Sequence, residues 1–156
     1  MIKDRQNEIT NWLREIHGIE MRFSTASLAA KHMNSIDLYK EEYKAVINGP
    51  VPKNEVDSLL NEFGVTEEFY RDWLIETGGG PIGPDWYDGI TELRDSQIKL
   101  ETEPWSISGF VIGWDGAGNP MVLQSTGVII TEDHNFGGVY EVASSFETLL
   151  NNGISS

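Results

Sequence analysis

The chain has 156 residues, and its five tryptophans, five tyrosines and six phenylalanines supply enough large side chains for the core of one domain. It contains no cysteine, which excludes disulfides and thiolate chemistry. No apolar run approaches the length that crosses a membrane, and the first ten residues lack the apolar segment of a signal peptide, so we expect a cytoplasmic protein without membrane contact.

The formal net charge of −14 is unevenly distributed along the chain. Residues 1–50 hold 7 basic and 7 acidic residues, whereas residues 51–156 hold 4 basic and 18 acidic residues. A field of this sign repels nucleic acid and attracts a basic partner. The alternative is a solvated acidic surface that aids solubility.

The first fifty residues predict a helical layer. Apolar residues recur at helical spacing over residues 2–16, and again over residues 28–46, where Asn48-Gly-Pro50 stops the helix. Between them, residues 19–23 alternate as a short strand or an extended link would.

Two helices follow, with their apolar faces marked by three- and four-residue spacing. The first starts near Pro52 and ends at Gly64, and the second is expected to be capped by Thr66 and ended by the glycines at 78–80. Residues 85–89 read as a loop rich in aromatics and carboxylates, and residues 90–93 as a short edge strand. Residues 94–108 show no clear pattern.

The stretch from 109 to 150 reads as an antiparallel meander closed by a short helix. We expect strands at 110–114, 120–123, 128–130 and 138–142, with turns at 115–119 and 125–127. Ser144 or Ser145 caps the final helix. Helices first and strands afterwards predict an α+β fold with a central, largely antiparallel sheet, flanking helices and one domain over 1–156.

Three motifs have the composition of a catalytic, metal-binding or phosphate-binding site. Asp133-His134 has the composition of a carboxylate–imidazole pair, but adjacent strand residues point to opposite faces. Asp115 and Asn119 offer oxygens to calcium without the full ligand spacing, and turn hydrogen bonds explain them better. The glycines at 78–80 follow a helix instead of opening one, as a phosphate loop would. We therefore expect no metal, no cofactor and no catalytic residue.

Carboxylates next to aromatic residues favour a protein-binding surface instead. Asp85-Trp86-Tyr87-Asp88 has the composition of a protein-binding hot spot, although Trp86 and Tyr87 would also suit the core. The remaining candidates are the carboxylates that flank the later turns: Asp115, Glu132 and Asp133.

The order of these segments resembles the SUKH superfamily, which includes fungal Smi/Knr-type cell-wall-assembly regulators and many bacterial immunity proteins. The resemblance spans about residues 51–154 and is carried by VTEEFY before a helix that ends in Gly-Gly, by GWDGAGNP, and by EDH followed at a distance by ASSFETLL. Residues 1–50 lie outside it and are interpreted as a helical extension packed on the domain. The resemblance implies a mixed α+β fold and a non-enzymatic role in binding and neutralising a toxin domain, often a nuclease.

The leading hypothesis is therefore an immunity protein that docks an acidic surface onto a basic toxin domain. A regulatory scaffold that binds its partner through the N-terminal helices is an alternative. A small metal-dependent hydrolase that uses Asp133 and His134 is a third hypothesis.

Overall fold

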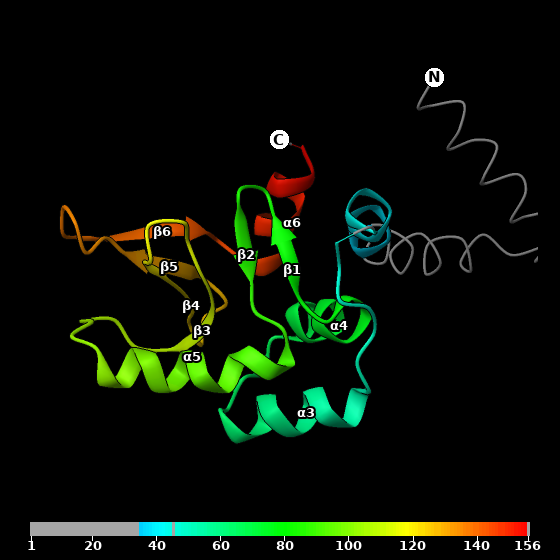
Figure 1. Cartoon of the computed structure of the whole chain (residues 1–156), viewed down its shortest axis with the longest axis horizontal. Helices are drawn as coiled ribbons and strands as arrows, with labels where there is room; N and C mark the ends of the chain where they lie inside the picture. Colours follow the sequence, from blue (N-terminus) through cyan, green and yellow to red (C-terminus); the bar gives the residue numbers. More distant parts are fainter. Residues whose placement is uncertain (1–34, 45, 156) are drawn as a thin grey trace, which may run out of the picture. The chain divides into compact units, whose positions relative to one another are not determined.

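The computed structural model describes residues 35–44 and 46–155 (Figure 1). The segments predicted at 2–16 and 19–23, and the first part of the helix predicted at 28–46, lie outside these residues. Residues 35–43 are helical, and one compact unit begins at Leu38. The elements that follow are α3 (Lys53–Glu62), α4 (Glu68–Thr77), β1 (Gly80–Ile82), β2 (Asp85–Tyr87), α5 (Ile90–Thr102), β3 (Phe110–Trp114), β4 (Pro120–Leu123), β5 (Ile129–Glu132), β6 (Val139–Ala143) and α6 (Phe146–Ser155).

The strands form one antiparallel sheet in the order β1-β2-β3-β4-β5-β6, so every strand pairs with its neighbours in the chain. This confirms the α+β class and the predicted meander closed by a helix. Pro120 opens β4, as expected of a residue without an N–H. Ser145 caps α6, because its Oγ accepts from the Thr148 N–H at 3.1 Å.

The expectation of a loop at 85–89 is wrong for residues 85–87, which form β2. Ile82 pairs with Asp85 across a two-residue turn, and Gly83 has the positive φ of +60° that a type II′ hairpin turn needs at its first central position. The glycines and prolines of this region therefore build a hairpin instead of an irregular segment.

The edge strand expected at 90–93 is also wrong, because Ile90 starts α5. Four residues of α5 at helical spacing are buried, and two of them are polar: Leu93, Ser96, Gln97 and Leu100. Polar residues on the buried face concealed the apolar pattern that identifies a helix.

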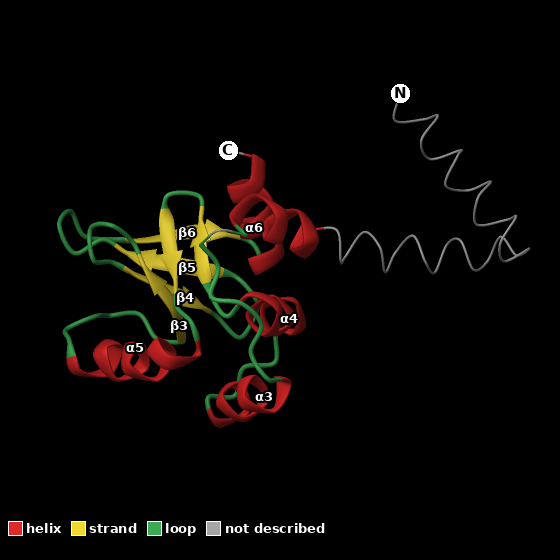
Figure 2. Cartoon of the chain, turned by 45° about the vertical axis from the view of Figure 1, so that its right-hand side comes forward, coloured by secondary structure: helices red, strands yellow, loops and turns green. Residues whose placement is uncertain are grey.

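Helices cover both faces of the sheet (Figure 2). On one face, Leu100 of α5 packs with Val111 and Val122 in an apolar cluster. On the other face, the Phe110 ring lies 6.3 Å from Tyr70 of α4, and Tyr70 lies 4.9 Å from Phe146 of α6. Phe110 and Val111 are neighbours on β3 and point to opposite faces, so β3 is covered on both sides, as its apolar sequence predicts.

A buried side-chain amide fastens α5 to β3. β2 ends at Tyr87 and does not reach Val111. Instead, Gln97 Nε2 donates to the Val111 carbonyl at 2.8 Å, and the Val111 N–H donates to Gln97 Oε1 at 2.8 Å. The Gln97 amide thus takes the place of a strand peptide and satisfies both backbone groups.

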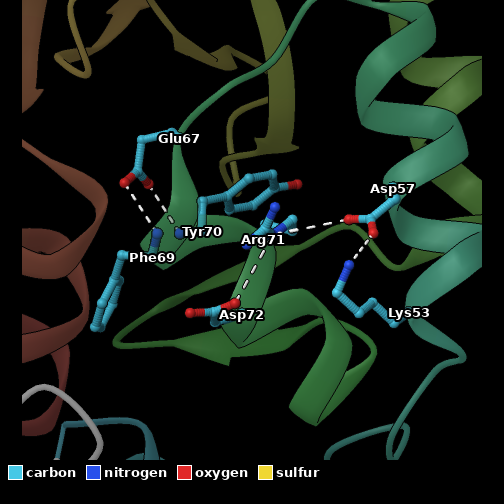
Figure 3. Close-up of polar contacts among 7 residues, drawn as sticks. All are labelled: Lys53, Asp57, Glu67, Phe69, Tyr70, Arg71 and Asp72. Atoms are coloured by element: carbon cyan, nitrogen blue, oxygen red, sulfur yellow. Dashed lines mark hydrogen bonds and ion pairs between the residues drawn. The ribbon is translucent and has the colours of Figure 1, made fainter. Parts of the chain in front are cut away.

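The N-terminal cap of α4 is Glu67, not Thr66 (Figure 3). The Glu67 carboxylate accepts from the Phe69 N–H at 3.1 Å and from the Tyr70 N–H at 2.8 Å. A carboxylate at this position satisfies two free N–H groups and also interacts favourably with the helix dipole.

Candidate functional site

Three hairpin turns lie at the same end of the sheet. In an antiparallel meander the turns β1–β2, β3–β4 and β5–β6 lie at the same end, because each joins an odd-numbered strand to the next. We call residues 82–86, 114–119 and 132–138 the hairpin end. These segments contain four carboxylates, Asp85, Asp115, Glu132 and Asp133, and no Lys or Arg.

The β3–β4 turn is organised by Asp115. One of its carboxylate oxygens accepts from the backbone N–H groups of Ala117 and Asn119, both at 2.9 Å, and the other accepts from the Asn119 amide at 3.2 Å. This confirms the predicted role of Asp115 within its own turn. The bonds occupy the carboxylate without neutralising its charge.

Asp85 joins the β1–β2 turn to this site. Burial raises the pKa of the Asp85 carboxyl, the negative charge of Asp115 raises it further, and a hydrogen bond with the Gly116 backbone opposes the shift. Asp85 and Asp115 belong to different hairpins whose turns lie at the same end of the sheet, so this end concentrates negative charge.

The β5–β6 turn is joined to the β3–β4 turn by a histidine. His134 Nδ1 lies 2.5 Å from Asn119 Oδ1, and the His134 N–H donates to the same oxygen at 3.0 Å. Asp133 instead accepts from the N–H groups of Asn135 and Phe136 at 2.8 and 3.1 Å. Asp133 therefore organises its own turn while His134 bonds to Asn119, so the two neighbours make separate contacts.

A cleft of about 590 Å³ opens between this turn and the segment that follows α5. Glu132 forms part of its wall, and Glu132 Oε1 accepts from Ser106 Oγ at 2.6 Å and from the Ser106 and Ile107 N–H groups at 2.8 and 3.1 Å. The Ser106 hydroxyl bond is the main cause that lowers the pKa of the Glu132 carboxyl. The Glu132 side chain thus stays charged and ties the 103–109 segment to β5.

The described lining of the cleft is acidic and aromatic. The Trp105 ring stands edge-on to the His134 ring, with centroids 5.9 Å apart. Three carboxylates and no Lys or Arg occur among the residues that line it: Glu103, Pro104, Trp105, Ala117, Gly118, Glu132, Asp133, His134 and Gly137. A larger cavity of about 700 Å³ borders the same segment, because Glu103 and Trp105 line both; it extends between the α3–α4 turn, residues 103–109 and the β4–β5 turn, and none of the predicted site residues line it.

The predicted residues 85–88 divide into two groups. Trp86 is 45% exposed and Asp85 is partly exposed, so both contribute to the surface. Tyr87 takes the alternative of a place in the core, so its inclusion among the partner-binding residues is not supported, and the expectation of a surface position for Asp88 is wrong. Tyr87 is buried with its hydroxyl 3.0 Å from Met121 Sδ, and Asp88 is buried and bonded to the Ser96 hydroxyl.

Strand alternation explains this division. Trp86 and Tyr87 point to opposite faces of β2, and Tyr87 pairs with Gly113, whose missing side chain leaves room for the close approach of the two strands. A Cβ at Gly113 would lie 2.8 Å from the Trp86 carbonyl oxygen. Burial raises the pKa of the Asp88 carboxyl, and the Ser96 hydrogen bond partly opposes that shift.

Sequence reasoning missed two surface features of the site. Phe136 at the tip of the β5–β6 turn is 91% exposed, the highest exposure of any large apolar side chain in the described part of the chain. Its position in Asn-Phe-Gly-Gly, a turn without apolar neighbours, was the available signal. Trp105 was missed because residues 94–108 show no pattern in the sequence.

Within residues 35–44 and 46–155, no three His, Asp or Glu residues are grouped closely enough to hold a metal ion. None of the described helices combines the length and the apolar character needed to cross a bilayer. A scan against protein-family models and a search among curated proteins both found no match to this chain.

Proposed function

We propose that the chain is a protein-binding module that holds a basic partner protein at the hairpin end. The observation that carries the proposal is the gathering of four carboxylates and two exposed aromatic rings, Trp86 and Phe136, on three adjacent turns that contain no Lys or Arg. Charge of one sign at one end steers a partner of opposite charge, and exposed aromatic anchors supply the apolar contact that slows its release.

The hydrogen bonds of the site favour binding without rearrangement. Asp115 and Asp133 are already fixed by their own turns, and Glu132 is fixed by residues 106 and 107. Side chains that are ordered before binding lose little conformational entropy when the partner arrives. The hairpin end is thus suited to fast docking of a preformed surface.

The acidic cleft gives this surface a specific contact for a cationic side chain. An Arg or Lys that enters the cleft would meet Glu103, Glu132 and Asp133, with the Trp105 ring beside them. One oxygen of Glu132 and one of Asp133 already accept hydrogen bonds, and Glu103 lies 3.9 Å from Lys99 Nζ, so the cleft attracts a cation through the negative charge of these groups. An aromatic face adds a cation–π contribution.

The resemblance to the SUKH superfamily supports a more specific form of the proposal, an immunity protein located in the cytoplasm. A nuclease toxin has a basic groove for phosphates, and an acidic protein surface can occupy that groove in place of the nucleic acid. Blocking the groove prevents substrate binding, so the proposed activity requires no catalytic residue in this chain.

The proposal is tested by affinity capture from a lysate of the source organism at low and high salt, with mass spectrometry of the bound proteins. We expect a basic protein that elutes with salt, is toxic when expressed alone and is harmless when expressed with this chain. A partner that is acidic, or one whose toxicity co-expression does not relieve, would contradict the immunity function.

A further inference from the structure

The two edges of the sheet differ in how they are protected. At the β1 edge, Pro81 lacks an N–H, and its carbonyl accepts from the Tyr39 hydroxyl at 2.7 Å. The Gly83 N–H donates to the Tyr43 hydroxyl at 3.3 Å. Proline and a covering helix are devices that prevent a sheet edge from pairing with another strand.

The β6 edge has no proline and no covering helix among the residues that the structure describes, and its β-bulge lies at the far end of the strand, between Glu141 and Ala143. β6 is the last strand of the sheet and pairs only with β5 on its inner side. It contains no Pro, Lys or Arg, and Val139 and Tyr140 are 49% and 54% exposed. Glu141 is exposed as well. An edge of this kind can accept a further strand.

The register identifies which backbone groups the β6 edge offers. The Asp133 N–H donates to the Gly138 carbonyl at 3.0 Å, so residues 133 and 138 form a hydrogen-bonded pair of the β5–β6 ladder. Hydrogen-bonded and non-hydrogen-bonded residue pairs alternate along an antiparallel ladder. Tyr140, paired with Thr131, directs its N–H and carbonyl toward β5. Val139 and Glu141 therefore direct theirs away from the sheet, and together they present two donors and two acceptors.

The same register sets the side-chain pattern of an incoming strand. Val139 pairs with Glu132 and Glu141 pairs with Ile130, so both carboxylates lie on one face of the sheet. Tyr140 lies on the opposite face, next to Thr131. On one face, an added strand would lie next to Val139 and Glu141 of β6, with Glu132 one strand further in, and on the other face it would lie next to Tyr140. A cationic residue of that strand fits beside Glu141, and apolar residues fit beside Val139 and Tyr140.

We infer that β6 is a docking edge for an extended segment of the basic partner, which places a Lys or Arg beside Glu141 and apolar residues beside Val139 and Tyr140. The basic character of the occupant rests on the proposed function; the free edge does not. A second copy of this chain fits less well, because antiparallel pairing about Tyr140 would make the two Glu141 side chains diagonal neighbours, and each chain carries a net charge of −14.

The test adds a peptide of alternating residues, Lys-Val-Lys-Val-Lys-Val-Lys with blocked ends, to the full chain. Hydrogen exchange of the protein's backbone amides is measured by NMR with and without the peptide. In the free protein we expect fast exchange at Val139 and Glu141 and slow exchange at Tyr140. The peptide should slow exchange at Val139 and Glu141. A peptide with Glu in place of Lys, and the Lys peptide with N-methylated valines, should not.

A pair of variants separates the backbone from the side chain. Glu141→Val removes the charge and keeps the outward N–H, whereas Glu141→Pro removes both. We expect Glu141→Pro to bind the Lys peptide about tenfold more weakly than Glu141→Val, because one edge hydrogen bond is lost and its acceptor stays unpaired. Protection of the Tyr140 amide in both variants verifies that β5 and β6 remain paired.

Three results would overturn the inference. The first is protection of Val139 and Glu141 in the free protein at low concentration, which would mean that another part of this chain already covers the edge. The second is protection that rises with protein concentration without peptide, the sign of a second copy. The third is peptide contact away from β6, or equal binding by the two variants. None of these results bears on whether the hairpin end holds a basic partner, so the two proposals fail separately.

Discussion

Replacing Gln97 by Leu should destabilise the protein strongly, although the new side chain is apolar and of similar size. The Gln97 amide satisfies both backbone groups of Val111, and Val111 is completely buried. Gln97→Leu leaves a buried N–H and a buried carbonyl without partners, each at about 1–3 kcal/mol. The expected loss is therefore about 2–6 kcal/mol, a large share of the roughly 5–15 kcal/mol by which domains are stable.

The assay is urea unfolding followed by tryptophan fluorescence. With a mid-range slope for small domains, about 2 kcal/mol per molar urea, this loss moves the midpoint down by about 1–3 M and leaves the slope unchanged. Gln124→Leu is the matched control, because Gln124 donates a single bond to the Ser108 carbonyl at the surface. A Gln97→Leu midpoint equal to that of Gln124→Leu would refute the role assigned to the Gln97 amide.

Three further predictions concern local features. Gly79→Ala should be more destabilising than Gly127→Ala by about 1–3 kcal/mol in thermal or urea unfolding. Both glycines have φ near +90°, so the backbone strain is the same, but only a Cβ at residue 79 would meet backbone atoms, at 2.7–2.8 Å. Equal losses would show that backbone strain alone sets the cost. The pKa of Asp88 is raised in the folded state, so the folded protein binds this proton more tightly than the unfolded chain does. The free energy of unfolding of the wild type, measured relative to Asp88→Asn, should therefore rise as the pH falls from the raised pKa toward the ordinary value of 3.8. A constant difference between pH 7 and pH 4 would contradict that shift. Glu67→Ala should lose about 0.5–2 kcal/mol in the same unfolding assay while Thr66→Ala loses little, and the reverse order would assign the cap to residue 66.

The meander was predictable because its signals are local. Apolar strands, the Asp115–Asn119 turn and the Ser145 cap each occupy a few adjacent residues whose chemistry has one main structural outcome. α5 was missed for the opposite reason. Its buried face includes Ser96 and Gln97, and their burial is explained by partners that lie elsewhere in the chain, Asp88 and Val111.

The candidate site was predictable residue by residue but not as an arrangement. Composition identified Asp85, Asp115 and Asp133, and only the strand order brings their three turns to the same end of the sheet. Whether Trp86 or Tyr87 faces outward depends on the register with β3, which sequence spacing does not contain. Phe136 was missed because an aromatic residue in a turn has no periodic pattern to mark it.

The most direct test of the hairpin end is the salt dependence of the association rate with the captured partner. The test variant combines Asp85→Asn, Asp115→Asn and Asp133→Asn, which removes three charges. The new amides keep an oxygen for the backbone N–H groups of the two turns, and the bond from the Asn119 amide to residue 115 is lost. The control variant removes three exposed charges from the helices: Glu55→Gln, Glu68→Gln and Glu101→Gln. Both variants have the same net charge, so only the position of the lost charges differs.

We expect the test variant to associate about tenfold more slowly than wild type at low salt and with a shallower salt dependence, because electrostatic steering acts through the site that the partner approaches. The control variant should stay close to wild type. Equal slowing in both variants would mean that total charge, and not the hairpin end, attracts the partner. An unchanged rate in the test variant would place the binding surface elsewhere on the protein.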